Sequence, residues 1–169
     1  MEYAFEKATM ADVDAVMGNI RAARGNGSAD WDEDYPTSEH IAEDIANGAL
    51  YVLRAPDHTI VASIAAYDDD REFEESSASA GWTMAAHSCS LFRLCVKADL
   101  QNRGLGFLIV SRIIDEARAR GCEVVRLLAS TDNAAPNRLY EKLNFRLLRS
   151  VYLYDWRFNA YEKQLTIEN

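Results

Sequence analysis

A glycine-containing turn between an apolar strand and an amphipathic helix is the segment of the sequence best suited to chemistry. It runs Leu94-Cys-Val-Lys-Ala-Asp-Leu-Gln-Asn-Arg-Gly-Leu-Gly-Phe107. The first turn of a helix presents backbone N–H groups without intrahelical partners and the positive end of the helix dipole, and this combination binds phosphate. Gly104 and Gly106 let the backbone approach a ligand closely, and Arg103 adds a positive charge. The segment therefore predicts a diphosphate-binding turn, with a plain strand-to-helix connection as the alternative.

Two common phosphate-binding loops do not match this turn. A Walker A loop requires Lys-Ser or Lys-Thr directly after its second glycine, whereas Phe107 and Leu108 follow Gly106 here. A dinucleotide-binding fingerprint requires a third glycine, and Ile109 occupies that position. The turn therefore belongs to neither class.

A second block downstream makes the pair of motifs specific. Gln101-Asn-Arg-Gly-Leu-Gly106 resembles the Gln/Arg-x-x-Gly-x-Gly/Ala pyrophosphate loop of the GNAT N-acetyltransferases, and Asn133-Ala-Ala-Pro-Asn-Arg-Leu-Tyr-Glu-Lys-Leu-Asn-Phe145 resembles that family's Asn-x-x-Ala-x-x-Leu-Tyr-Glu-Lys-Leu-Gly-Phe. The two blocks stand in the family's order and cover about residues 90–148. Pro136 and Asn144 depart from the pattern, but proline is tolerated at the first helical position and asparagine in a left-handed helix cap.

The resemblance implies an acetyl-CoA site and assigns residues to it. The backbone of the strand end would hold the pantetheine arm in the manner of an added strand, and the amides of the turn would hold the diphosphate. Two asparagines of the second block would bond the pantetheine arm or nearby backbone. The implied set is Leu94, Cys95, Val96, Gln101, Asn102, Arg103, Gly104, Leu105, Gly106, Phe107, Asn133 and Asn137.

The resemblance also implies that Tyr140 lies near the thioester sulfur and protonates the departing thiolate, while an amine attacks the thioester directly. The ordinary pKa of a tyrosine, about 10, lies near that of an alkyl thiol. A packed aromatic residue without a catalytic role is the alternative for Tyr140. Cys95 is not expected to act as a nucleophile, because no adjacent base is visible.

The general base is not evident from the sequence. The strand segment Ser88–Val96 contains no carboxylate, although some family members carry a glutamate there. His87 is the best single candidate for the base, and a chain of water molecules is the stronger alternative. Other carboxylates that could flank the acceptor are Asp155, Asp32 to Asp34 and Asp68 to Asp70.

Aromatic residues mark a candidate acceptor pocket. Trp31, Tyr35 and Pro36 lie in the loop between the first two predicted helices, which borders the acceptor in this family. Their rings could contact a cationic amine, and packing of the loop onto the core is the alternative. Three functions remain open: acetylation of a small-molecule primary amine, acetylation of a protein or peptide amine, and acyl-CoA sensing without turnover.

Strands alternate with helices along the chain, which predicts one α/β domain over residues 1–169. The resemblance implies a mostly antiparallel sheet of about seven strands, splayed between the fourth and fifth, with about four helices. Residues 68–81 lack periodicity and predict a long mobile loop. Strands are predicted at 3–7, 50–54, 60–67, 90–96, 124–129, 145–154 and 161–166, and helices at 12–24, from Thr37 or Ser38 to Asn47, 107–120 and 136–143.

The charge distribution along the chain limits the classes of partner that we expect. The net charge is −9; residues 1–89 hold 18 acidic and 5 basic side chains (−13), and residues 90–149 hold 11 basic and 6 acidic (+5). Nucleic-acid binding by the whole surface is therefore not expected, whereas a local basic region can receive phosphates. No signal peptide or membrane span is evident, and three unpaired cysteines fit a reducing cytoplasm. No metal ligand spacing is found. The apolar carboxy-terminal strands permit a homodimer.

Overall fold

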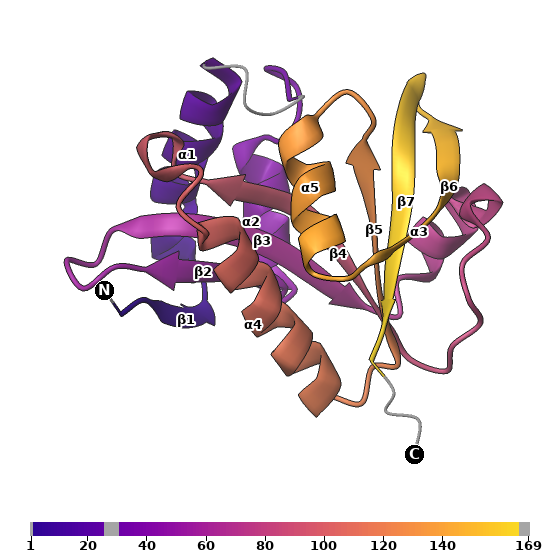
Figure 1. Ribbon diagram of the computed structural model, residues 1–169. Coiled ribbons are helices and arrows are strands. Elements are labelled where there is room, and N and C mark those ends of the chain that lie inside the picture. The colour runs from indigo at the N-terminus through magenta and orange to yellow at the C-terminus, as the bar shows by residue number, and fades with distance from the viewer. Residues whose placement is uncertain (1, 26–30, 166–169) are drawn as a thin grey trace. The chain divides into compact units, whose positions relative to one another are not determined.

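The computed structural model describes residues 2–25 and 31–165, and its seven strands are hydrogen-bonded in the order β1-β2-β3-β4-β5-β7-β6 (Figure 1). The strands are β1 (Ala4–Lys7), β2 (Leu50–Arg54), β3 (Ile60–Asp68), β4 (Ser88–Val96), β5 (Val124–Ser130), β6 (Arg146–Leu153) and β7 (Trp156–Gln164). The α-helices are α1 (Val13–Gly25), α2 (Ser38–Ala46), α3 (Arg71–Ser76), α4 (Leu105–Ala119) and α5 (Ala134–Lys142). Three short 3-10 helices are η1 (Met10–Asp12), η2 (Ala78–Ala80) and η3 (Ala98–Leu100).

The sheet is mixed and mostly antiparallel, which confirms the predicted fold class. Strands β1 and β2, β2 and β3, β5 and β7, and β7 and β6 pair antiparallel, whereas β4 and β5 are parallel. Among the described residues, parallel pairing runs from Ser88 with Val124 to Ser90 with Arg126, although both strands continue beyond these residues. This short pairing agrees with the predicted splay between the fourth and fifth strands.

Residue contacts divide the chain into two compact units, each built from two stretches of sequence. The first unit comprises residues 1–66 and 93–112, and the second comprises residues 67–92 and 113–169. Strands β3 and β4 and helix α4 pass from one unit to the other. The single domain predicted over residues 1–169 stays a prediction.

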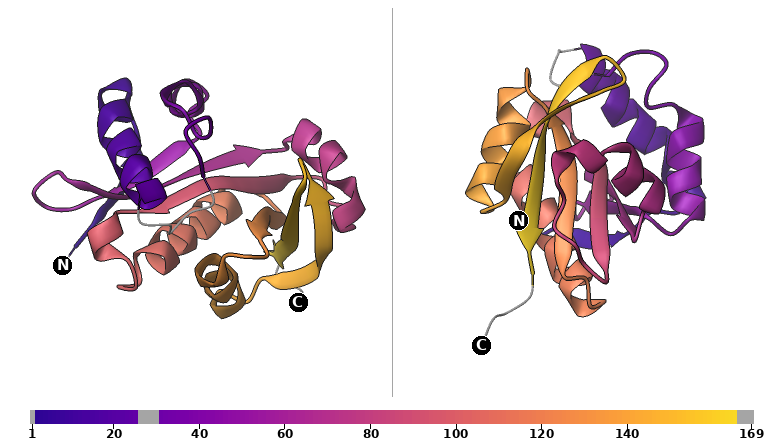
Figure 2. Two further views of the ribbon diagram at one scale, coloured as in Figure 1. Left: turned by 90° about the horizontal axis from the view of Figure 1, so that it is seen from above. Right: turned by 90° about the vertical axis from the view of Figure 1, so that its right-hand side faces the viewer.

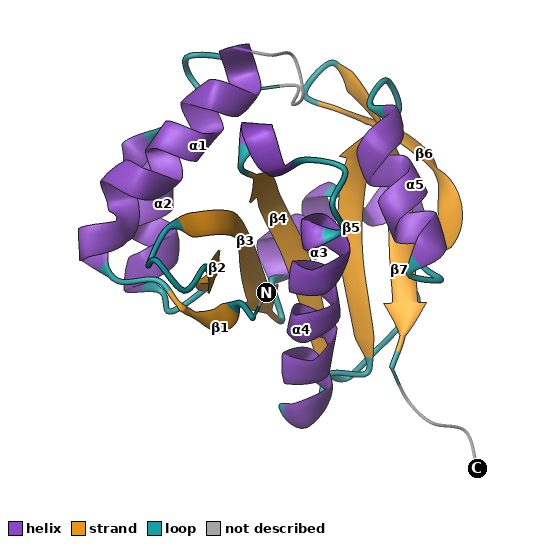
Figure 3. Cartoon of the chain, turned by 60° about the vertical axis from the view of Figure 1, so that its left-hand side comes forward, coloured by secondary structure: helices purple, strands orange, loops and turns teal. Residues whose placement is uncertain are grey.

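The first unit places helices α1 and α2, which contact each other, with the β1–β2–β3 strands (Figure 3). Its core is formed by apolar side chains at helical spacing on α1 and α2 together with the almost fully buried strand β2. Asn19 of α1 donates a buried hydrogen bond to the Ile60 carbonyl at 3.0 Å. Thr37 caps α2, as predicted, by accepting from the backbone N–H of His40. Gly48, in the left-handed region at φ +66°, follows its end.

The second unit is layered around strands β5, β7 and β6. Successive residues of a strand point to opposite faces. Ala160 of β7 belongs to a buried cluster with Ala80 of η2 and Val151 of β6, whereas the next residue, Tyr161, contacts Tyr140 of α5. The segment that contains α3 and η2 and helix α5 therefore cover opposite faces of β7 (Figure 2).

The predicted loop over residues 68–81 is wrong, because α3 and η2 form there. Asp70 caps α3 by accepting from the Phe73 amide at 3.0 Å. The Phe73 ring lies 4.9 Å from the Phe92 ring and 5.9 Å from the Trp82 ring, centroid to centroid. Six residues are too few to show a clear apolar period in the sequence. A helix this short also has little intrinsic stability, and packing stabilises it here.

Several predicted boundaries also shift. Helix α4 begins at Leu105 rather than Phe107, and β7 begins at Trp156 rather than Tyr161. Helix α5 begins at Ala134, so Pro136 is its third residue, where its missing N–H still costs no intrahelical bond. Asn144 adopts the predicted left-handed conformation, φ +64°. Part of the loop between the first two helices and the predicted strand end at Thr166 lie outside the described residues.

Candidate functional site

The turn between β4 and α4 has the backbone of an anion-binding loop. After β4 ends at Val96, η3 and the turn lead to the first helical residue, Leu105. Asn102 and Gly104 both have left-handed backbone conformations, with φ +63° and φ +80°, and both are exposed. The Gln101 amide donates to the Val96 carbonyl at 3.4 Å, which ties the turn to the strand end.

The space above Gly104 is open. A Cβ atom placed on this glycine would meet no atom of the described residues within 4 Å, so its backbone conformation, rather than crowding, demands a glycine. Leu105 is buried and anchors the start of α4. Helix geometry leaves the amides of Leu105, Gly106 and Phe107 without intrahelical acceptors. These residues therefore fit a bound diphosphate.

The end of β4 contributes a backbone edge rather than reactive side chains. Leu94 and Val96 are half-buried, and Cys95 is buried. Burial raises the pKa of the Cys95 thiol to about 12, so this thiol stays protonated at neutral pH. All three cysteines, Cys89, Cys95 and Cys122, are free and buried. None has the exposed, anion-stabilising surroundings of a catalytic thiol.

Sequence reasoning missed Arg93, which directly precedes this strand end. Its φ of +56° is left-handed, an uncommon conformation for a residue other than glycine. Its guanidinium makes a bidentate ion pair with the buried Asp44 of α2, with N–O distances of 2.6 and 2.8 Å. It also donates to the Tyr35 hydroxyl at 2.9 Å. The only signal in the sequence was a charged residue inside an otherwise apolar strand.

Tyr35 and Trp31, the acceptor candidates from the first loop, belong to the first unit. Tyr35 is exposed on part of its surface, its hydroxyl accepts from Arg93, and its ring meets the His40 ring edge-on at 5.0 Å. Trp31 is half-buried. The structure thus links the acceptor candidate Tyr35, through Arg93, to the strand that ends in Leu94–Val96.

Tyr140 lies on α5 in the second unit and is 5% exposed. Its ring packs against Phe145 at 5.4 Å and Tyr161 at 5.8 Å between centroids. Among the described residues no hydrogen bond to its hydroxyl is found. Burial raises the pKa of the phenol well above its usual value. The hydroxyl therefore stays protonated and is available to a ligand.

Asn137 is engaged within the protein. Its amide nitrogen donates to the carbonyls of Ser130, at 2.8 Å, and Asn133, at 2.7 Å. Its amide oxygen accepts from Asn159 and from the Tyr161 hydroxyl, each at 2.8 Å. An amide has two donor hydrogens and one acceptor oxygen, so these bonds use both hydrogens and both lone pairs. Of the two predicted roles for Asn137, the bond to nearby backbone is the one seen.

The base candidates lie elsewhere. His87 precedes β4, at the opposite end of that strand from Leu94–Val96, and its exposed ring contacts Asp69 at 3.3 Å. Asp68 pairs with Arg120 at 2.7 Å, and Asp70 caps α3. These carboxylates serve structural contacts, so this placement does not favour His87 or its neighbours as the base.

The described residues contain no group of three or more His, Cys, Asp or Glu side chains placed to hold a metal ion. In the same part of the chain no helix is long and apolar enough to cross a membrane. The first unit brings together the strand end, the glycine turn and Tyr35. The second unit brings together Asn133, Asn137 and Tyr140, and His87 joins neither group.

The sequence profile of the FR47-like protein family matches residues 71–156, more than half of the chain. The chain belongs to the GNAT family of N-acetyltransferases. The matched region includes the glycine turn, Asn133, Asn137 and Tyr140, all of which the motif comparison singled out.

Relatives of this GNAT chain differ in how much of it they cover. The L-methionine sulfoximine/L-methionine sulfone acetyltransferase of Pseudomonas aeruginosa is 27% identical over 87% of this chain and 82% of its own. The ribosomal protein bS18-alanine N-acetyltransferase of Salmonella typhimurium is 41% identical over 33% of this chain. The chain spans 38–48% of the length of the first curated relatives it matches.

Solved structures share the GNAT fold. The Salmonella typhimurium protein yncA, solved with its cofactor acetyl-CoA, has a TM-score of 0.75 at 19% identity, and the match covers 100% of this chain and 97% of that chain. At this identity the likeness concerns the fold alone.

Proposed function

We propose that this GNAT protein transfers an acetyl group from acetyl-CoA to the primary amine of a small molecule. The observation that carries the proposal is the turn Gln101–Phe107, with left-handed Asn102 and Gly104 and open space above the glycine at the start of a long helix. A diphosphate fits this arrangement because backbone amides and the helix dipole converge on one exposed point.

The remaining roles follow the family motif. Acetyl-CoA, when bound, supplies an activated acyl thioester. The backbone of Leu94, Cys95 and Val96 would pair with its pantetheine arm, and Gln101 to Phe107 would hold its diphosphate. Asn133 opens α5, and Asn137 fixes the start of that helix to Ser130. Asn137 therefore serves the site by holding α5 in place.

In the reaction, a neutral amine attacks the thioester carbonyl; the C–N bond forms and the C–S bond breaks. The amine loses a proton to solvent water, and the leaving sulfur receives one through Tyr140, which takes its proton back from solvent water. Tyr140 is proposed to donate to the leaving sulfur. Its raised pKa keeps the phenol protonated but also makes it a weaker acid, so a hydrogen bond to the developing thiolate is its principal contribution.

A small-molecule acceptor is favoured by the extent of the alignments. The Pseudomonas relative, whose acceptors are amino acid derivatives, aligns with most of this chain, whereas the ribosomal-protein acetyltransferase aligns over 56 residues. That shorter match keeps a protein amino terminus as the second candidate acceptor.

The test is acetyl transfer with the full chain, acetyl-CoA and three sets of acceptors: amino acids, polyamines and peptides with free amino termini. Product masses identify the acetylated atom, and thiol release gives the rate. We expect turnover with a small amine and slower turnover with peptides. Acetyl-CoA binding without turnover of any amine would contradict the enzyme proposal and support an acyl-CoA sensor.

A further inference from the structure

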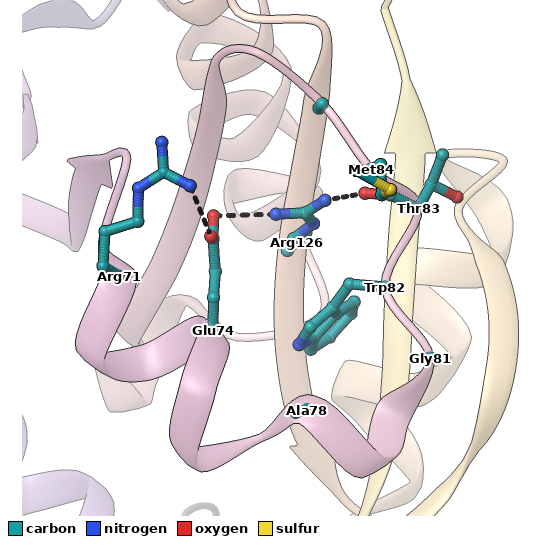
Figure 4. A pocket seen from close by; sticks show the side chains of 9 residues that line it. Arg71, Glu74, Ala78, Gly81, Trp82, Thr83, Met84 and Arg126 are labelled. Carbon is teal, nitrogen blue, oxygen red and sulfur yellow. Dashed lines mark hydrogen bonds and ion pairs between the residues drawn. The ribbon is translucent and has the colours of Figure 1, made fainter.

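A cavity in the second unit has no part in the proposed diphosphate site. It has a volume of about 300 Å³ and lies between α3, the segment 81–85 and strand β5 (Figure 4). This volume is at the lower end of the range for small-ligand sites. The lining side chains that carry the argument are Arg71, Glu74, Trp82, Thr83, Met84 and Arg126.

Arg126 of β5 is 4% exposed and carries an unsatisfied donor. Its Nη1 donates to Glu74 Oε1 at 2.7 Å, its Nη2 donates to the Thr83 carbonyl, and its guanidinium carbon lies 5.8 Å from the centre of the Trp82 ring. Within the described part of the chain its buried Nε has no hydrogen-bond acceptor, since the Glu162 carboxylate is 3.9 Å away. A buried donor without an acceptor is unfavourable, so the cavity is prepared for a ligand that supplies an acceptor.

Two glutamates contact Arg126 and already accept hydrogen bonds, and of these only Glu74 lines the cavity. Glu74 Oε1 also accepts from the Ser88 hydroxyl at 2.5 Å, and Glu162 accepts from the backbone N–H and the hydroxyl of Thr83. The second oxygen of Glu74, Oε2, has a 3.7 Å contact with Arg71, longer than a hydrogen bond. That oxygen therefore has room for a donor.

Charge selects the ligand class. The charged side chains that line the cavity are Arg71, Arg126 and Glu74, so groups of both signs face a ligand. An anion alone would leave Glu74 Oε2 without a donor, and a cation alone would leave Arg126 Nε without an acceptor. A zwitterion can satisfy both groups.

We propose that this cavity binds a small zwitterion with a carboxylate and an ammonium group, such as an α-amino acid. The carboxylate accepts from Arg126 Nε and from Arg71, whose side chain is 70% exposed at the rim. The ammonium donates to Glu74 Oε2. Trp82 and the exposed Met84 receive an apolar side chain. Binding of this zwitterion does not depend on the proposed function. Only the role of the bound ligand, as acetyl acceptor or as regulator, rests on that function.

The test is calorimetric titration of the full chain with L-methionine, L-leucine and L-glutamine, and with the amide of the best binder, which lacks the carboxylate. We expect at least one amino acid to bind, and its amide to bind at least about tenfold more weakly because a charge-assisted pair is lost. Absence of binding by all three, or an amide that binds equally well, would overturn the proposal.

Two arginine variants form a matched pair. Arg71→Ala removes an exposed arginine three residues before Glu74, and Arg118→Ala removes an exposed arginine three residues after its partner Asp115 on α4. The Arg71 side chain is 70% exposed and that of Arg118 is 46% exposed, so both variants should fold. Arg71→Ala should weaken amino acid binding at least about tenfold, and Arg118→Ala should leave it within about twofold. Equal effects would contradict the proposal.

Two further experiments identify the role of the ligand and separate this proposal from the proposed function. If the bound amino acid becomes acetylated, it is the acceptor; if it stays unmodified and changes the turnover of another amine, it is a regulator. Both results support amino acid binding in the cavity. Titration of Arg71→Ala with acetyl-CoA should match the wild type. If the wild type binds acetyl-CoA normally but binds no amino acid, only the cavity proposal is contradicted. If it binds an amino acid but not acetyl-CoA, the proposed acetyl transfer is contradicted.

Discussion

At the scale of single residues, two buried tyrosines on one face of the second unit have different tasks. Tyr161 donates to the Asn137 amide oxygen at 2.8 Å, so its hydroxyl serves the fold. Tyr140 has the same kind of aromatic packing, but no described hydrogen bond holds its hydroxyl. The group that remains available for chemistry is therefore the Tyr140 hydroxyl.

The tyrosine pair gives a direct prediction. Tyr140→Phe keeps the ring packing and should lower kcat by about 10²–10⁴-fold, while the unfolding free energy changes little. Tyr161→Phe should cost about 1 kcal/mol of stability through the lost hydrogen bond, with much less effect on kcat. Steady-state kinetics and urea unfolding of both variants measure these quantities. Equal kcat values for Tyr140→Phe and the wild type would contradict the proposed role of Tyr140 as the acid.

Single residues also mark where sequence reasoning ends. Tyr140 and the glycine turn were predictable because they stand in two motifs at fixed spacing. Arg93 was not predictable, because its partners Asp44 and Tyr35 lie 49 and 58 residues away in the chain. The engagement of Asn137 inside the protein likewise depends on β7, whose start the sequence pattern did not show.

At the scale of elements, a buried ion pair joins β4 to α2. Arg93, the residue of β4 with a left-handed backbone conformation, forms this pair with Asp44. Arg93 is 13% exposed and Asp44 is 3% exposed, so the pair is largely removed from water. Burial disfavours the charged guanidinium and acts to lower the pKa of Arg93, but the hydrogen bonds and charges of Asp44 and Tyr35 together outweigh burial and raise this pKa. Such a pair is strongly disrupted when one partner is lost, because a buried charge remains.

Arg93→Met should therefore lower the unfolding free energy by about 3–5 kcal/mol, measured by urea denaturation. The double variant Arg93→Met/Asp44→Leu should recover most of that loss because no charge is left buried. As a control, Arg118→Met breaks the exposed Arg118–Asp115 pair and should cost less than about 1 kcal/mol. A similar small loss for Arg93→Met would show that the pair does not hold β4.

Helix α3 shows why a short element escapes prediction. Its six residues, Arg71–Ser76, contain three glutamates and one phenylalanine, which does not give an apolar period. Packing of Phe73 against Phe92 and Trp82, and the pair between Glu74 and Arg126, supply its stability. Longer elements such as α4 carry their own apolar stripe and were predicted within two residues at the start.

At the scale of the whole molecule, buried thiols make stability depend on pH. Burial raises the pKa of Cys95 to about 12 from an ordinary value of 9.0. Above pH 9 the unfolded chain therefore loses this proton while the folded chain keeps it, and the unfolding free energy falls as pH rises.

We expect this thiol to contribute a slope of about −1.4 kcal/mol per pH unit between about pH 9 and 11, and none below about pH 8. Urea unfolding of the wild type and Cys95→Ala under reducing conditions measures it. The variant should show a shallower decline above pH 9. Parallel curves for the two proteins would contradict the assignment.

The central claim is that the glycine turn binds acetyl-CoA, and two glycines at opposite ends of α4 test it. Gly104 and Gly121 share left-handed conformations, φ +80° and φ +88°, and a Cβ atom at either would meet none of the described atoms within 4 Å. Gly104→Glu and Gly121→Glu therefore impose similar backbone strain, but only Gly104→Glu places a carboxylate in the glycine turn. Calorimetric titration with acetyl-CoA should give similar affinities for the wild type and Gly121→Glu, and an affinity at least about tenfold lower for Gly104→Glu. Absence of binding by the wild type, or equal losses in the two variants, would contradict the account.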